Sequence, residues 1–235
     1  MDRGEIGRNV KTFGVLKTIQ DLGLRILNRI LLLKILKGVA ISKPDPNFTK
    51  CAENYRGLFL DRSMLMEFAA DPQNELTEMF VREAFDKGDE CYGFLCGDSL
   101  ASYGWYSREP TPIHPPELML YFERGYIYMY KGFTHVNHRG QRLHAVGMTR
   151  ALETYRARGY KGIVSYVEWN NFGSLRSCYR MGYSDFGAIM VFRLFGRYFA
   201  HSSAGCRRYG FRLERRGRKS SREETRPKAR ATAQL

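Results

Sequence analysis

The chain has 235 residues, of which 43% are hydrophobic and 26% charged, which is enough for one well-formed α/β core with appendages. Its formal net charge of +14 comes from the two ends: residues 1–50 carry 10 Lys and Arg against 4 Asp and Glu, residues 206–235 carry 11 against 3, and residues 51–205 hold 17 of each. The neutral centre argues against a nucleic-acid groove through the core, so nucleic acid is the less favoured partner.

The cysteine and histidine patterns argue against a metal-binding protein and against a protein of an oxidising compartment. The five cysteines form no Cys-x-x-Cys pair and the five histidines lack ligand-like spacing, so we predict no metal site. An odd number of cysteines without a cleavable signal sequence favours the reducing cytoplasm. We divide the chain into a basic amphipathic segment over residues 1–50, an α/β domain over 51–214, and a tail over 215–235 that is too poor in large apolar groups to fold alone.

The N-terminal segment has the pattern of an amphipathic helix. Six apolar residues fall on one helical face: Leu16, Ile19, Leu22, Ile26, Leu27 and Ile30. The apolar run continues to Lys37, which is too short and too charged to span a bilayer but suits a helix lying on an anionic membrane surface. The alternatives are a helix packed on the core and a helix in the seam of a homodimer. The predicted location is therefore the cytoplasm, with the inner face of a membrane as a candidate attachment surface.

The central domain has the pattern of short helices and strands. The predicted elements are helices over 61–70 and 74–87, a hairpin over 91–106, a loop over 110–116, and strands over 117–122, 126–136, 186–194 and 209–213. Tyr126, Tyr128 and Tyr130 share one face of the strand over 126–136. We interpret this face as packed in the core, and the alternative is that it lines a substrate cleft.

The stretch from Thr134 to Tyr183 has the pattern of a phosphate site. A predicted strand ends in a loop, a helix starts at Leu143 and ends before Gly159, and a buried strand follows over 161–168. The backbone N–H groups of such a loop converge with the first turn of the helix on one small volume. Gly140 permits close approach of the backbone, and two arginines add charge that pairs with phosphate. The alternative is that these arginines are ordinary surface charges.

Two motifs in this stretch resemble those of the GNAT superfamily of N-acetyltransferases. The family's pyrophosphate motif, Gln/Arg-x-x-Gly-x-Gly/Ala, falls on residues 137–142, with Asn137 in place of Gln or Arg and Arg142 in place of Gly or Ala. Its next motif, Asn-x-x-Ala/Ser before a helix that ends in Gly-Phe, falls on Asn171, Ser174 and Gly182-Tyr183. The resemblance covers roughly residues 92–192. It implies an α/β (α+β) fold: a mixed, mainly antiparallel sheet flanked by helices.

The resemblance also implies a co-substrate, which is acetyl-CoA or another acyl-CoA, and no metal. The residues that it assigns to this co-substrate are Thr134, His135, Val136, Arg139, Gly140, Gln141, Arg142, Leu143, His144, Asn171 and Ser174. For the last two, the alternative is a purely structural role at the start of the following helix, where an Asn side chain caps the free N–H groups.

Four residues are candidates for the acid and the base of an acyl transfer. The family's leaving-group acid is a Tyr seven residues after the motif Asn, a position that holds Cys178, with Tyr179 one place later. Because one residue turns a helical side chain by about 100°, Tyr179, Cys178 and a water all remain candidates. Glu168 and His135 are candidates for the base, with an ion pair and a structural hydrogen bond as the alternatives. The family's oxyanion donor, a backbone N–H, maps to residues 133–135.

These features predict an acyltransferase that moves an acetyl group from acetyl-CoA to a small-molecule amine. The amine acceptor is implied by the resemblance alone. One alternative is a longer-chain acyltransferase that acts on a lipid-linked or envelope precursor, because the N-terminal segment is apolar. The other is a non-catalytic adaptor that binds acyl-CoA or nucleic acid, because the acid position is atypical and both ends are basic.

Overall fold

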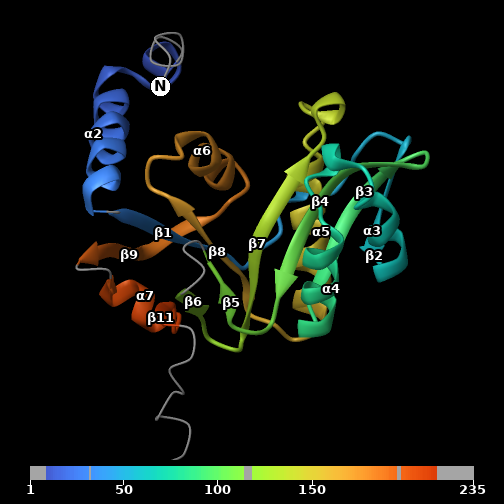
Figure 1. The fold of residues 1–235 in the computed structure, drawn as a ribbon. Helices are drawn as coiled ribbons and strands as arrows, with labels where there is room; N and C mark the ends of the chain where they lie inside the picture. The colour runs from blue at the N-terminus through green and yellow to red at the C-terminus, as the bar shows by residue number, and fades with distance from the viewer. Residues whose placement is uncertain (1–8, 32, 114–117, 195–196, 216–235) are drawn as a thin grey trace, which may run out of the picture.

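The computed structural model describes residues 9–31, 33–113, 118–194 and 197–215. Its centre is an eight-stranded sheet in the order β10-β9-β1-β8-β7-β4-β3-β2 (Figure 1). Every neighbouring pair in this sheet is antiparallel except β7 with β8. The strands are β1 (Lys34–Ile41), β2 (Tyr55–Leu60), β3 (Glu90–Cys96), β4 (Ser99–Ser107), β7 (Tyr126–Thr134), β8 (Gly162–Glu168), β9 (Ser184–Leu194) and β10 (Arg197–Ser202). A smaller sheet holds β5 (Thr111–Pro112), β6 (Leu118–Tyr121) and β11 (Arg212–Arg215).

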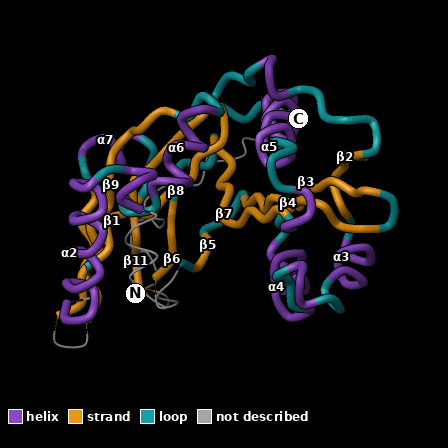
Figure 2. The backbone as a smooth tube through the Cα atoms, turned by 90° about the horizontal axis from the view of Figure 1, so that it is seen from above, coloured by secondary structure: helices purple, strands orange, loops and turns teal. Residues whose placement is uncertain are grey.

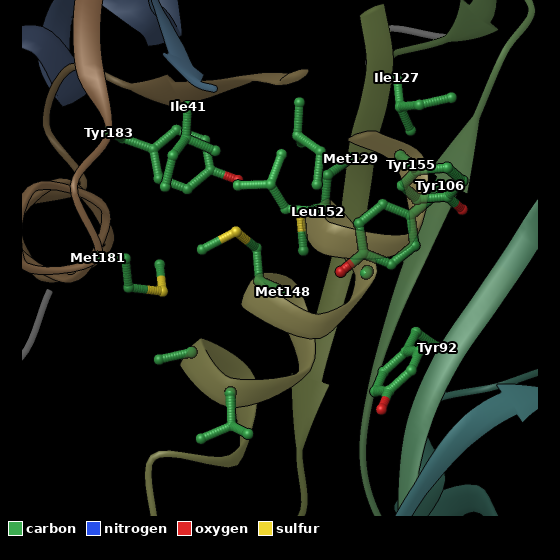
Figure 3. Close-up of a cluster of buried hydrophobic side chains, with 14 of the residues drawn as sticks. Ile41, Tyr92, Tyr106, Ile127, Met129, Met148, Leu152, Tyr155, Met181 and Tyr183 are labelled. Carbon is green, nitrogen blue, oxygen red and sulfur yellow. The ribbon is translucent and has the colours of Figure 1, made fainter. Parts of the chain in front are cut away.

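The helices cover both faces of the large sheet, as predicted for this fold class (Figure 2). They are α2 (Val15–Leu31), α3 (Arg62–Phe68), α4 (Glu78–Lys87), α5 (Leu143–Ala157), α6 (Phe172–Arg180) and α7 (Ala204–Arg208). α5 and α6 share one buried cluster on one face, in which Met148, Leu152 and Met181 meet side chains from the strands (Figure 3). α3 and α4 pack on β2, β3 and β4 from the other face.

Local signals place most helix ends. The Asp61 side chain accepts a hydrogen bond from Met64 N at 2.9 Å and starts α3, as predicted. The helix predicted from residue 74 begins only at Glu78, because Thr77 caps it and Glu75 is left-handed with φ 52°. The interpretation of the tyrosine face as packed is confirmed, since Tyr128 is 1% exposed and its two neighbours pack against the same cluster.

The strand β1 lies in the middle of the sheet, between β8 and β9. The prediction that the N-terminal helix continues to Lys37 is therefore wrong beyond Leu31. A short apolar run is compatible with a helix and with a strand. Here it is a strand buried on both faces, since Leu36, Val39 and Ile41 are at most 3% exposed. Residues 34–41 thus belong to the central sheet, although they fall within the segment that we had separated from the α/β domain.

The helix α2 packs with polar side chains inward. Thr18 and Asp21 are 4% and 3% exposed, whereas Leu16 and Ile19 are 70% and 60% exposed. Asp21 accepts a hydrogen bond from Asn170 Nδ2 at 2.8 Å, which ties the helix to the turn after β8. Outside the described side chains lie Ile26, Leu27 and Ile30. Within the described ranges, no helix is long and apolar enough to cross a membrane.

The parallel strands β7 and β8 pair over only three residues, and the last pair is Tyr128 with Val164. β7 carries a bulge just beyond it. Opposite β4, Met129 and Lys131 pair with consecutive residues, so Tyr130 is the extra one. Because a bulge bends its strand and increases the local twist, the end of β7 turns away from β8 and the two strands part.

A truncation series tests the position of β1. Removal of residues 1–33 deletes α2 and keeps the sheet, so we expect cooperative unfolding like that of the full chain. Removal of residues 1–41 also deletes the buried side chains of Leu36, Val39 and Ile41, each contributing about 1.5–3 kcal/mol, and leaves β8 and β9 without a partner on the edges that face β1. We expect this shorter chain to lose its cooperative transition, measured by circular dichroism on heating. A cooperative transition in the shorter chain would contradict the central position of β1.

Candidate functional site

The parting of β7 from β8 opens a cleft between β7, α5 and α6. Its cavity has a volume of about 220 Å³, and the residues that line it are Gly132, Phe133, Thr134, His144, Ser174, Ser177, Cys178 and Met181. Of the residues that the sequence assigned to the co-substrate, Thr134, His144 and Ser174 therefore lie together. Cys178, a candidate acid, lies with them.

The open edge of β7 supplies backbone donors to this cleft. His135 N donates to Ala101 O at 2.9 Å, so this N–H points toward β4. Successive residues of a strand alternate the edge to which their N–H groups point, so the N–H groups of Thr134 and Gly132 point toward the cleft. Within the range of residues 133–135 proposed for an oxyanion donor, this geometry selects Thr134.

The loop over residues 139–142 runs directly into the first turn of α5, which carries His144 of the cleft lining, and we call this loop the mouth of the cleft. Gly140 adopts φ +82° and Arg142 adopts φ +57°, and Arg142 provides no side-chain cap for the helix that follows. The N–H groups of the first turn of α5 therefore keep their donors for another acceptor. Arg139, Gln141 and Arg142 are exposed, whereas Leu143 is 1% exposed and anchors the helix.

Arg142 adopts the left-handed backbone conformation, which favours glycine. Placing a side chain in the left-handed region costs roughly 1–2 kcal/mol. The chain therefore places an exposed cation at a strained backbone position directly before α5.

His144 packs directly on β7 from the first turn of α5. A Cβ added to Gly132 would lie 2.6 Å from His144 Cε1, so only glycine leaves room for the ring. Burial lowers the pKa of His144 below its ordinary value of 6.5. The imidazole is therefore neutral at pH 7, with one nitrogen able to donate and the other able to accept a hydrogen bond.

The helix α6 presents small neutral side chains to the cleft. Asn171 caps it, because its Oδ1 accepts a hydrogen bond from Ser174 N at 3.1 Å; the predicted helix cap is thus present, and Ser174 also lines the cleft. Burial, followed by the charge of Asp185, raises the pKa of Cys178 to about 11. This thiol stays protonated at pH 7 and is a weak acid there, since an ordinary thiol titrates near 8.5.

Tyr179 lies on the other side of α6, away from the cleft. Its hydroxyl donates to Asp185 at 2.9 Å and accepts a hydrogen bond from Lys37 Nζ at 3.0 Å. It lines a second cavity between α6 and α2. The structure therefore separates the two candidates for the acid: Cys178 faces the cleft and Tyr179 does not.

The two candidates for the base also lie outside the cavity of the cleft. Glu168 forms an ion pair with Lys34 at 3.0 Å. It follows Val167, which is buried in the cluster under α5, so strand alternation places Glu168 on the opposite face of the sheet. His135 Nε2 lies 3.3 Å from Gln73 Oε1 and lines another cavity, of about 250 Å³, beside α3. Val136 is exposed on the loop and lines neither cavity.

Three residues of the cleft were missed by sequence reasoning: Gly132, Ser177 and Met181. Ser177 and Met181 follow Ser174 at helical spacing, so the periodicity of α6 carried a usable signal. For Gly132 the signal depends on the bulge at Tyr130, which shifts the faces of all later residues of β7.

Known proteins resemble this chain in structure and not in sequence. No family model and no curated protein matches the chain. Solved structures that it resembles include a protein of the GNAT family from Novosphingobium aromaticivorans, at 15% identity and a TM-score of 0.47, over 68% of this chain and 63% of that one. A GCN5-related N-acetyltransferase-like protein from Streptococcus suis shares 11% identity with a TM-score of 0.48, over 79% of this chain and 68% of that one.

A third solved structure, an N-acetyltransferase from Staphylococcus aureus, shares 12% identity with a TM-score of 0.45, over 69% of this chain and 99% of that one. The chain thus spans less than two thirds of the Novosphingobium protein. The strand order and pairing of the large sheet confirm the predicted fold class, a mixed, mainly antiparallel sheet flanked by helices.

The raised pKa of Cys178 makes a chemical prediction. A thiolate forms only as the pH approaches about 11, so iodoacetamide should alkylate Cys178 negligibly at pH 8 and increasingly above pH 10. Half-buried Cys51 and Cys96 serve as internal reference thiols, and mass spectrometry of the peptides measures each rate. Alkylation of Cys178 at pH 8 as fast as that of the reference thiols would contradict the buried, protonated thiol.

Proposed function

We propose that the chain is an acyl-CoA-dependent acyltransferase that moves an acyl group, with acetyl as the leading candidate, to an amine. One observation carries the proposal: β7 and β8 part beside the start of α5, which has no side-chain cap. The opening therefore lies between the cationic loop with Arg139 and Arg142 and the backbone N–H groups of Gly132 and Thr134. The mouth suits the pyrophosphate of CoA, and the narrow opening suits its pantetheine arm.

The proposed reaction uses the groups on both faces of the opening. The nitrogen of a neutral amine attacks the thioester carbonyl carbon, and the negative charge that develops on its oxygen accepts a hydrogen bond from Thr134 N–H. The C–S bond then breaks, and sulfur leaves with the electron pair as a thiolate. The proton lost by the amine passes to a base, and the thiolate takes up a proton from water or from a neutral donor of the cleft.

We assign the base to Glu168. It lies on the face of the sheet opposite α5 and α6, from which an acceptor reaches the carbonyl without crossing the co-substrate. Its carboxylate lies 3.0 Å from Lys34 Nζ at the end of β8. His135 is the second candidate for this role, and its hydrogen-bond distance to Gln73 argues for a structural one.

A co-substrate experiment tests the mouth of the cleft. Arg139→Ala combined with Arg142→Ala should weaken CoA binding by at least about tenfold, because charge-assisted contacts to phosphate are lost at an exposed loop. Isothermal titration calorimetry measures the affinity. Arg82→Ala, which removes an exposed arginine from α4, is the matched control. Equal CoA affinity in the double variant and the wild type would rule out this phosphate site.

A kinetic experiment tests the base. Glu168→Gln should lower kcat/KM for the amine at pH 7 by about 100-fold, the scale typical of general base catalysis, with CoA affinity unchanged. Thiol release from acetyl-CoA in the presence of an amine panel measures turnover. Glu153→Gln, an exposed position on α5, is the control. Longer acyl-CoA species and a lipid-linked amine in the same assay test the alternative substrates, and no release with any pair would favour the non-catalytic adaptor.

We propose in addition that α2 attaches the enzyme to anionic membranes. The support is its outward apolar face, with Val15, Leu16 and Ile19 at least 60% exposed, beside a basic N-terminal segment. Leu16→Asp with Ile19→Asp should abolish co-sedimentation with anionic liposomes at low salt while thermal stability stays unchanged. Met79→Asp, which charges an exposed apolar residue on α4, should leave sedimentation intact. Sedimentation of the double variant at the wild-type level would exclude α2 as the anchor.

A further inference from the structure

A second cavity, of about 550 Å³, lies between α2, α6 and β1, and no part of the proposed reaction uses it. Its volume falls in the range of small-molecule sites, which is roughly 300–1,000 Å³. Four cationic side chains line it: Lys17, Lys37, Arg176 and Arg180. No carboxylate is among the residues that line this cavity in the described part of the chain.

The cations of this cavity are only partly neutralised. Lys37 forms an ion pair with Asp185, which is not among the residues that line the cavity. Among the described residues, no carboxylate forms an ion pair with Lys17, Arg176 or Arg180. Like charges held together in this way repel one another, so an anion that enters the cavity gains from all of them.

The walls of the cavity are aromatic. Phe13 of the N-terminal segment and Phe172 of α6 have ring centroids 5.6 Å apart. Lys17 Nζ lies 5.5 Å from the centre of the Phe172 ring, and Arg176 Cζ lies 5.3 Å from the centre of the Phe13 ring. Aromatic faces and guanidinium planes of this kind stack on planar heterocycles.

Cations beside stacking surfaces define the chemistry of the ligand. A phosphate group would pair with the lysines and arginines, and a planar heterocycle would stack on the phenyl rings. Gln20, which also lines the cavity, carries both a donor and an acceptor for the edge of such a heterocycle. We propose that the cavity between α2 and α6 binds a nucleoside phosphate.

This site is distinct from the cleft, although both use α6. Arg176, Tyr179 and Arg180 face α2, whereas Ser177 and Cys178 face β7. Helical geometry sets these two groups on opposite sides of the helix. The nucleotide part of CoA itself is the nearest competing occupant, and the experiment must separate the two.

The test uses ADP as the probe and the full-length chain. We expect ADP to bind the wild type by isothermal titration calorimetry, and Arg176→Ala with Arg180→Ala to weaken this binding by at least about tenfold. Phe172→Ala should weaken ADP binding but not the weaker binding of inorganic phosphate. Arg82→Ala is the matched control. Arg180→Ala alone covers the case in which the double variant unfolds, because no described contact of Arg180 stabilises the fold.

Three outcomes would overturn the proposal. The first is no ADP binding to the wild type, or an equal loss in the control. The second is competition: if saturating CoA displaces ADP and the double variant loses CoA affinity equally, the cavity belongs to the CoA site. The third is a double variant that no longer binds anionic phospholipid vesicles but binds ADP as tightly as the wild type does. This result would assign the cations to a lipid headgroup.

Discussion

The structure depends on the parting of β7 from β8. Ser165 Oγ donates to Met129 O at 2.7 Å and forms the last link between the two strands. Beyond it the bulge at Tyr130 is fixed from the α4 side, where Tyr130 OH donates to the buried Asp89 at 2.7 Å and Lys131 Nζ donates to Glu75 O at 2.8 Å. Asp89 is 2% exposed and pairs with Lys87. Polar contacts from β8 and from the α4 side thus hold β7 on both sides of the point where the strands part.

Three elements converge on this opening with different chemistry. The start of α5 contributes positive charge and free N–H groups, β7 contributes a row of backbone donors, and α6 contributes neutral side chains. The pKa of His144 is lowered and that of Cys178 is raised, so both groups are uncharged at pH 7. Positive potential is therefore concentrated at the mouth, and the interior is neutral. An elongated molecule with charge at one end and a neutral arm matches this distribution.

The sequence predicted the parts of the structure that local patterns specify. α5 and β8 carry period 3.6 and a buried β-branched run, and Asn171 has the residue type and spacing of a helix cap. The sequence failed where distant contacts decide. The apolar run is a strand from Lys34 onward because β8 and β9 pair with it on both edges, and the bulge in β7 depends on Asp89, some 40 residues away. Contacts distant in sequence also decide which side of α6 carries Tyr179, so the sequence does not predict it.

The position of α6 between two cavities has a thermodynamic consequence. Leu175 and Met181 anchor it in the cluster beneath α5, and the contacts of Lys37 with Tyr179 and Asp185 hold its outer side to β1. A ligand on the outer face alters the affinity for a ligand in the cleft only if it binds two positions of α6 with different affinities. Because such coupling is reciprocal, CoA would then change the affinity of the outer cavity by the same factor. α6 is a nine-residue helix in which Leu175 is the one buried side chain, and an element with so little buried surface shifts at low cost.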